Sequence, residues 1–180
     1  MKNYLKVALI LFLICAVSAL FLGVINHITA PVIAENTQKE TLSALEQVSG
    51  GLEIGSERAG EGNINYVIPL SEGGVIKGYI LSLSATGYGG TMTIVASYYS
   101  DGSLISAKMM GNSETPGLGK KAEEGWYMLQ FVGLGGDKSL PKSKNDLADP
   151  SAVSGASVTF NGVTKALTAG SEYVKSLGGK

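Results

Sequence analysis

The sequence predicts an α+β domain carried by one N-terminal transmembrane helix. Three features support this: an uncharged apolar run near the N-terminus, four β-rich segments in the middle, and an amphipathic helical pattern at the end. The 180 residues fit one anchor and one compact domain that needs no disulfide or metal to fold. We expect residues 1–30 to be the cytoplasmic N-terminus and transmembrane helix, 31–51 an amphipathic helix, and 52–180 the folded domain.

The predicted anchor is residues 7–25, an uncharged run in which 13 of 19 residues are Val, Leu, Ile or Phe. At 1.5 Å per residue the run spans roughly 28 Å, close to the hydrocarbon thickness of a bilayer. Lys2 and Lys6 precede it, so the positive-inside rule places the N-terminus in the cytoplasm. We therefore expect a single-pass protein of the cell membrane with its domain on the outer face.

A cleaved signal peptide and a lipoprotein signal are two other interpretations of this run. Residues 16–18 would serve as a cleavage site, but the apolar run continues beyond them to Ile25. A lipoprotein signal needs a small residue before its cysteine, and Ile14 stands before Cys15. An uncleaved span fits better, with Cys15 as a small apolar side chain inside it or, less simply, near a partner's cofactor.

The β-rich segments predict an antiparallel sheet, because strands in sequence followed by helices are typical of α+β domains. Asp101-Gly102, between two such segments, is a favourable hairpin turn. Gly73-Gly74 and residues 87–90 are further glycine-rich turns. The predicted strands are residues 66–69, 75–83, 91–99 and 104–110.

Helical patterns flank these strands. One amphipathic pattern covers residues 32–48 and ends at Gly50-Gly51, with Pro31 as a break or as the first turn of a new helix. A short helix is expected around residues 122–131, and a final amphipathic helix at about residues 161–177. The remaining polar and turn-rich stretches are expected to be loops: residues 52–63, 112–119 and 141–150.

Composition excludes several classes of function. The chain has one cysteine and one histidine, too few soft ligands for a zinc, iron–sulfur or haem site held by the protein. The formal net charge is −1, and without Lys2 and Lys6 it is −3, which argues against a nucleic-acid partner. A serine–histidine hydrolase lacks a base, because His27 lies at the edge of the membrane span.

Two segments, residues 113–119 and 154–159, are not explained by packing. The second has small residues, Gly155 and Ala156, beside the hydroxyl groups of Ser154, Ser157 and Thr159. Placed before a helix, such a segment favours a phosphate, because the first backbone N–H groups of a helix have no intrahelical partner. The simpler interpretation is a serine or threonine N-cap and its approach loop.

These segments resemble the FMN-binding domain shared by the G subunit of the Rnf complex, an ion-translocating ferredoxin:NAD oxidoreductase, and the C subunit of the sodium-pumping NADH:quinone reductase. The chain has the family's N-terminal membrane helix and its Glu-Thr-Pro-Gly-Leu-Gly segment at 114–119. It also has Ser-Gly-Ala-Ser at 154–157, similar to the family's Ser/Thr-Gly-Ala-Thr flavinylation motif. The glycine-rich turn at 87–90 and the aromatic residues after the Glu-Thr-Pro segment, Trp126 and Phe131, add to the resemblance, which covers essentially the whole chain.

The resemblance implies covalent FMN, joined by a phosphoester to the hydroxyl of Ser157 by a flavin transferase that uses FAD. It implies that Gly155 and Ala156 flank the phosphate. Near the flavin ring it places three residues of the other motif: Glu114, Thr115 and Leu118. An aromatic contact to the ring from Trp126, Tyr88 or Phe131 is the alternative to a place in the core.

Two positions depart from the family pattern. Ser157 stands where the family usually has threonine, and Ser151 stands where it has an acidic residue. Serine supplies the same nucleophilic oxygen, Asp149 is the nearest substitute for the acid, and Thr159 is the reserve acceptor.

We therefore expect a membrane-anchored electron-transfer subunit of an Rnf-type complex, with other membrane subunits as partners, no nucleic acid and no independent catalysis. The C-type subunit of a sodium-pumping NADH:quinone reductase is the second hypothesis. A flavin-free structural or assembly subunit is the third, and a stand-alone flavoprotein delivering electrons to external acceptors is the fourth.

Overall fold

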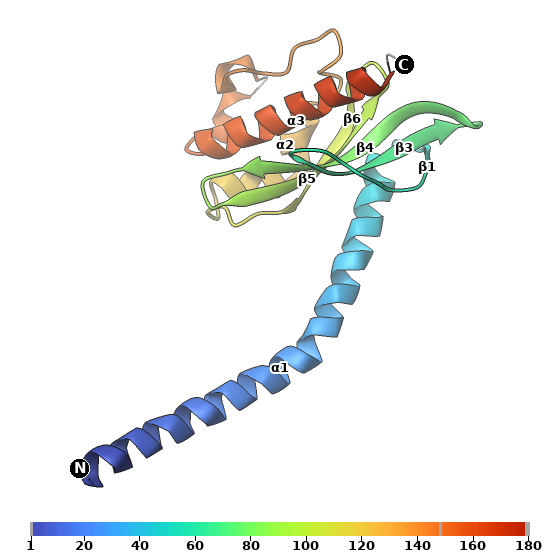
Figure 1. The fold of residues 1–180 in the computed structure, drawn as a ribbon. Helices are drawn as coiled ribbons and strands as arrows, with labels where there is room; N and C mark the ends of the chain where they lie inside the picture. The colour runs from blue at the N-terminus through green and yellow to red at the C-terminus, as the bar shows by residue number, and fades with distance from the viewer. Residues whose placement is uncertain (1, 148, 179–180) are drawn as a thin grey trace. The chain divides into compact units, whose positions relative to one another are not determined.

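A computed structural model describes residues 2–147 and 149–178 of the chain. The chain divides into two compact parts, one ending at Leu42 and one beginning at Ser43. The first part consists of helix α1 (Lys2–Val48) up to Leu42, and the second contains the end of that helix and the folded domain (Figure 1). Each part is described by itself.

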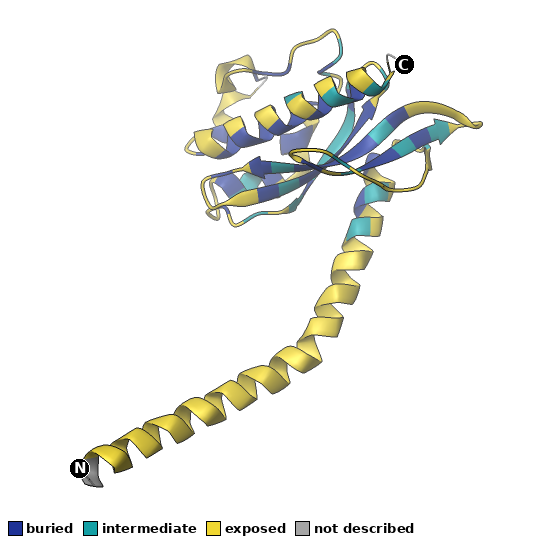
Figure 2. Ribbon diagram, viewed as in Figure 1, coloured by how far each residue is buried: buried dark blue, intermediate teal, exposed yellow. Residues whose placement is uncertain are grey.

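In the described part of the chain, α1 is the one helix that is long and apolar enough to cross a membrane. Its apolar side chains are exposed throughout residues 4–33, as Figure 2 shows in yellow. A helix that exposes Leu, Ile and Phe on every side needs an apolar solvent or a partner around it. The predicted N-terminal membrane helix thus has the required length and surface.

The predicted break at Pro31 is wrong, because α1 continues through this residue. Proline has no N–H group, so the carbonyl of His27 loses one intrahelical hydrogen bond, while the bonds on either side remain. The fully exposed helix has room to adjust around the ring, and a proline in such a place bends a helix rather than ending it.

The domain is built on an antiparallel sheet that has six strands within the described residues. The spatial order is β1-β3-β4-β5-β6, with β2 also paired to β3 (Figure 1). The strands are β1 (Glu53–Ile54), β2 (Arg58–Ala59), β3 (Ile64–Glu72), β4 (Val75–Thr86), β5 (Thr91–Tyr99) and β6 (Leu104–Gly111). The predicted α+β class with an antiparallel sheet and flanking helices is confirmed.

The two shortest strands lie in a segment predicted to be loop. The prediction of a loop over residues 52–63 is wrong in part, because β1 and β2 pair there with β3. A strand of two residues is too short to show the alternation of apolar and polar residues by which strands are predicted from sequence. Such a strand forms because a neighbouring strand is there to pair with it.

The predicted turns connect the long strands. Gly73 and Gly74 join β3 to β4 with φ angles of 57° and 80°, a conformation that glycine adopts without steric cost. Asp101 lies in the β5–β6 turn, where its carboxylate accepts hydrogen bonds from the backbone N–H and the hydroxyl of Ser103 at 2.8 and 2.6 Å. These two bonds hold the pKa of Asp101 below its usual value.

Both faces of the sheet are apolar, so each needs a cover. Tyr98 on β5 belongs to the larger core, where its hydroxyl donates to the carbonyl of Leu167 on helix α3 (Ser157–Gly178) at 3.1 Å. Val95, on the other face of β5, packs in a second cluster with Val48 from the end of α1. The carbonyl of Val48 accepts a hydrogen bond from buried Ser97. The two covers of the sheet therefore come from opposite ends of the chain.

Short helical turns complete the domain. The expected helix around residues 122–131 is present as a 3₁₀ turn, η1 (Gly119–Glu123), followed by α2 (Gly125–Leu129). The stretch 141–150, expected as loop, contains the turn η2 (Lys144–Asp146), and η3 (Pro150–Val153) follows it. Phe131, two residues after α2, and Phe160 of α3 are both fully buried, with ring centroids 6.3 Å apart.

Gly170 lies where α3 packs closely on the sheet, so a substitution there tests this packing. A Cβ at this position would lie 2.5 Å from the hydroxyl oxygen of Tyr98. Alanine normally stabilises a helix interior by about 1 kcal/mol relative to glycine, but overpacking costs about 1–3 kcal/mol. The net expectation is that Gly170→Ala lowers the free energy of unfolding by up to about 2 kcal/mol in urea denaturation. The control is the exposed Ala169→Gly, with a loss of about 1 kcal/mol from propensity alone; a gain of stability in Gly170→Ala would contradict this packing.

Candidate functional site

Three segments far apart in the sequence meet at one end of α3. They are the turn between β4 and β5, the loop after β6, and the first turn of α3 itself. The 114–119 and 154–157 motifs lie on the second and third of these segments. The sheet brings the first two together, because β5 and β6 form a hairpin, and α3 adds the third by packing across β4 and β5.

Helix α3 begins at Ser157, four residues earlier than Asn161, where the sequence pattern placed its start. Phe160 donates its N–H to the carbonyl of Ala156 at 3.0 Å, the first bond of the helical series. The N–H groups of Ser157, Val158 and Thr159 come before it, and no described residue accepts from them. The motif therefore leads directly into the helix, and its last residue, Ser157, is the first residue of α3, with three free N–H groups beside the Ser157 hydroxyl.

A half-open cavity of about 460 Å³ lies between these segments. That volume is in the range of small-molecule and cofactor sites, about 300–1,000 Å³. Its lining residues are Tyr88, Glu114, Thr115, Leu118, Gly119, Gly155, Ala156, Ser157, Val158 and Thr159. All but one of the residues predicted for the site from sequence are therefore on a single cavity.

The exception is Ser154, which is exposed at the end of η3 and is not among the described lining residues. Gly155 follows it with a φ of +80°, which turns the chain into α3. Asp149, the suggested substitute for the missing acid, caps η3 by accepting from the N–H and hydroxyl of Ser151 at 3.0 and 2.5 Å. The described lining of the cavity does not include Asp149.

Glu114 is the buried charge of the site, with 3% of its surface exposed. Its Oε1 accepts the N–H of Gly89 at 2.8 Å, and its Oε2 accepts the hydroxyl of Thr159. Thr159 is itself buried, at 1% exposure, and is oriented toward Glu114. The carboxylate thus joins all three segments that form the site.

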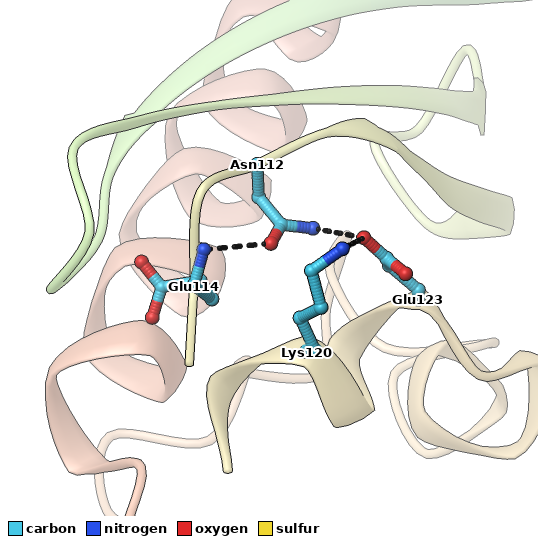
Figure 3. Close-up of polar contacts among 4 residues, drawn as sticks. All are labelled: Asn112, Glu114, Lys120 and Glu123. Atoms are coloured by element: carbon cyan, nitrogen blue, oxygen red, sulfur yellow. Dashed lines mark hydrogen bonds and ion pairs between the residues drawn. The ribbon is translucent and has the colours of Figure 1, made fainter. Parts of the chain in front are cut away.

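Figure 3 shows the backbone of Glu114 held from the other side by Asn112. The amide oxygen of Asn112 accepts the Glu114 N–H at 3.0 Å, and its nitrogen donates to Glu123 at 2.8 Å. Lys120 lies 3.4 Å from the same Glu123 oxygen. The Glu114 carboxylate points away from these residues. The opposite charges of Lys120 and Glu123 pair with each other near the surface.

Tyr127 on α2 is a buried neighbour of this carboxylate. Burial raises the pKa of its phenol, and the charge of Glu114 raises that pKa further. No described residue accepts or donates a hydrogen bond at its hydroxyl. The phenol therefore stays protonated at neutral pH and leaves one donor inside the protein next to the site.

Sequence reasoning missed two residues of the cavity and left a third undecided. Val158 and Gly119 line the cavity, although the motif resemblance gave neither a role. Tyr88, one of three aromatic candidates, lies on its rim at 78% exposure. The other two are elsewhere: Phe131 is core and Trp126 is partly exposed on α2 outside the described lining. In the sequence, the position of Tyr88 between two glycines is the one feature that indicates a place at the cavity.

The cavity fits a phosphate-bearing, ring-containing ligand such as a flavin nucleotide. Free helix N–H groups and the exposed Ser157 hydroxyl provide donors for a phosphate. Leu118 and Val158, at 42% and 50% exposure, add apolar surface to the same lining. A Cβ at Gly155 would lie 2.9 Å from the Leu118 side chain, so glycine allows the two motif segments to approach closely.

Comparison with known families agrees with this fit. Residues 87–172 match the FMN-binding domain, a stretch that begins at the β4–β5 turn and ends in α3. Residues 1–48 match the RnfG N-terminal region, which corresponds to α1. The chain resembles the G subunit of Rnf complexes. The predicted resemblance is confirmed.

Three relatives, each the G subunit of its complex, extend the match over the whole domain. One belongs to the proton-translocating ferredoxin:NAD(+) oxidoreductase complex of Clostridium ljungdahlii and is 27% identical over 92% of this chain and 89% of the relative. A second, from the Na(+)-translocating complex of Acetobacterium woodii, is 29% identical over 98% and 94%. A third, from an ion-translocating oxidoreductase complex of Methanosarcina acetivorans, is 29% identical over 97% and 96%.

Two glycines of the Glu-Thr-Pro-Gly-Leu-Gly segment provide a matched test of the site's packing. A Cβ at Gly119 would overlap the Glu114 carboxylate and lie 2.6 Å from Thr159 Oγ1, whereas a Cβ at Gly117 would meet nothing within 4 Å. Gly117 has a φ of +75°, so alanine there costs about 1 kcal/mol of backbone strain. We expect Gly119→Ala to lose about 1–3 kcal/mol of unfolding free energy and to separate Glu114 from Thr159. Equal ligand binding and stability in the two variants would contradict this arrangement.

Proposed function

We propose that this chain is a membrane-anchored electron-transfer flavoprotein, the G-type subunit of an Rnf-type ion-translocating ferredoxin:NAD oxidoreductase complex. The observation that carries the proposal is the convergence of the two motif segments on one cavity next to the free N-terminus of α3. The match to the FMN-binding domain and the named relatives support it. The other subunits of the complex are its partners, and it relays electrons between their redox centres without catalysis of its own.

Ser157 is the attachment point for FMN in this proposal. Its hydroxyl is exposed on the cavity, and no described residue bonds it. Thr159, the other hydroxyl of the helix start, is buried and already donates to Glu114. A hydroxyl that must meet both a phosphorus atom and a transferase needs access, which favours Ser157.

Attachment is a phosphoryl transfer made by a separate flavin transferase. The Ser157 oxygen forms a bond to the phosphorus of the FMN half of FAD, the phosphoanhydride bond breaks, AMP leaves, and the hydroxyl proton passes to the transferase or to water. The product phosphate has charge that the three N–H groups of the α3 start are oriented to bind. Bound flavin supplies one-electron and two-electron redox chemistry, which none of the chain's own side chains provides at low potential.

The chain's own residues orient and shelter the cofactor. Gly155 and Ala156 allow close approach to the phosphate, and the exposed side chains of Leu118, Val158 and Tyr88 lie where an apolar ring would rest. Thr115, next to Glu114 in the loop after β6, adds a hydroxyl to the lining. Covalent attachment suits a site this open, because a dissociated flavin outside the cytoplasm would be lost by dilution.

The first test is the Ser157→Ala variant beside the native chain, both produced with a flavin transferase. We expect flavin fluorescence and one extra FMN by intact mass in the native denatured chain, and neither in the variant. Ser176→Ala, an exposed serine of the same helix far from the motif, is the control that keeps its flavin. Fluorescence that survives Ser157→Ala would move the bond to Thr159 or elsewhere, and a native chain without flavin would favour the hypothesis of a flavin-free structural role.

The proposed orientation places the N-terminus in the cytoplasm and the domain on the outer face, in a single pass through α1. Lys2 and Lys6 ahead of the apolar run support this arrangement. Alkaline phosphatase fused to the C-terminus should be active and a cytoplasm-dependent fluorescent protein dark in the same position. The opposite pattern would reverse the orientation.

The partner subunits are tested by co-purification. Co-purification with NADH:quinone reductase subunits, in place of ferredoxin:NAD oxidoreductase subunits, would support the second hypothesis, a C-type subunit of a sodium-pumping NADH:quinone reductase.

A further inference from the structure

The burial of Glu114 is the feature of the site that costs the most free energy unless it is compensated. Transfer of a carboxylate out of water is costly unless hydrogen bonds compensate it, and an apolar side chain would fill the same space without that cost. Here both carboxylate oxygens have partners, one on each side: the N–H of Gly89 and the hydroxyl of Thr159. The two partners lie 25 and 45 residues away in the sequence.

The backbone around Glu114 leaves room for this carboxylate and for little else. A Cβ at Gly87 would lie 2.9 Å from the carboxylate carbon, and one at Gly89 would lie 3.1 Å from the Glu114 nitrogen. At Gly119 a Cβ would overlap the Glu114 carboxylate. Gly87 and Gly119, on two separate segments, are thus packed against the Glu114 side chain, and Gly89 is packed against the backbone of Ser113 and Glu114.

The two partners of Glu114 lie on two segments that line the cavity. Thr159 lies two residues after Ser157 in the first turn of α3, so its side-chain bond holds that turn in place. Gly89 adjoins Tyr88, which lines the same cavity from the β4–β5 turn. Asn112 in turn holds the backbone of Glu114 at 3.0 Å. A single carboxylate therefore links the helix start that carries Ser157 to the turn that carries Tyr88.

We infer that Glu114 is a positioning residue for flavin attachment: through Gly89 and Thr159 it holds the cavity in its open, receptive form before any flavin is present. This inference rests on the proposed function of the same cavity. It differs from a ring contact by Glu114, because both carboxylate oxygens are turned to protein donors. Its consequence is that geometry, more than the charge of Glu114, controls how fast Ser157 receives FMN.

Three substitutions separate geometry from charge. Glu114→Gln removes the charge but keeps both contacts, since its amide oxygen can accept from Gly89 and its amide nitrogen can donate to the Thr159 hydroxyl. Glu114→Ala removes both contacts, and Thr159→Val removes only the contact to α3 while keeping the side-chain shape. Glu172→Ala, an exposed acidic residue of α3 away from the motif, is the matched control.

The full-length chain would be incubated with transferase and FAD, and the initial rate of FMN addition followed by intact mass. We expect Glu114→Ala to be slower by about tenfold or more, and Thr159→Val by about tenfold, because the first turn of α3 is no longer held. Glu114→Gln should recover most of the rate, and Glu172→Ala should match the native chain. Native rates in both Glu114→Ala and Thr159→Val would overturn the inference, as would a Glu114→Gln rate as low as that of Glu114→Ala.

A second measurement needs no flavin. Amide hydrogen exchange of the flavin-free chain should show Gly89 exchanging about tenfold faster or more in Glu114→Ala, with the amides in the middle of β5 unchanged. Unchanged protection at Gly89 would overturn the inference. If Glu114→Ala does not fold, Thr159→Val and Glu114→Gln decide the outcome. A native chain that accepts no flavin would remove the proposed function, while the exchange of Gly89 would still test whether Glu114 holds the cavity.

Discussion

The structure depends on a sheet that is apolar on both faces and therefore needs two covers. Helix α3 covers one face, and the last residues of α1, from Ser43 to Val48, cover the other. A sheet in water with one bare apolar face would lose a large part of its stabilising burial. The C-terminal end of α1 is thus part of the domain's core, and the buried hydrogen bond from Ser97 to the Val48 carbonyl fixes this end.

The same packing creates the functional site. Because α3 lies across β4 and β5, its first turn is brought to the end of the sheet where the β4–β5 turn and the loop after β6 also emerge. Binding residues on loops and helix starts, held by a rigid scaffold, are a common arrangement in α+β domains. The cavity is half open, and the chain exposes Tyr88, Leu118 and Val158 around it. A ligand held in such a place remains accessible from outside the domain.

The site combines two kinds of polar group with different tasks. Ser157 and the free N–H groups of α3 face the cavity and are available to a ligand. Glu114 and Thr159 are buried and satisfy each other. A low local dielectric strengthens such a buried contact and makes its loss costly, so the buried pair contributes rigidity to the residues that meet the ligand. Binding residues that are held by such supporting hydrogen bonds keep their geometry better than binding residues without that support.

The sequence by itself determined the features that depend on local patterns. An uncharged apolar run predicted the membrane helix, strand predictions for β5 and β6 agree with the structure to within one residue, and the two motif segments identified the flavin family. Only the tertiary structure decided that α1 continues through Pro31, that α3 begins at Ser157, and that Thr159 is buried against Glu114. The physical reason is the distance along the chain over which each feature is determined. The period of two residues in a strand, or of 3.6 in a helix, can be recognised within one segment. The burial of a hydroxyl, by contrast, depends on a carboxylate 45 residues away, which only the folded sheet and helix bring within hydrogen-bonding distance.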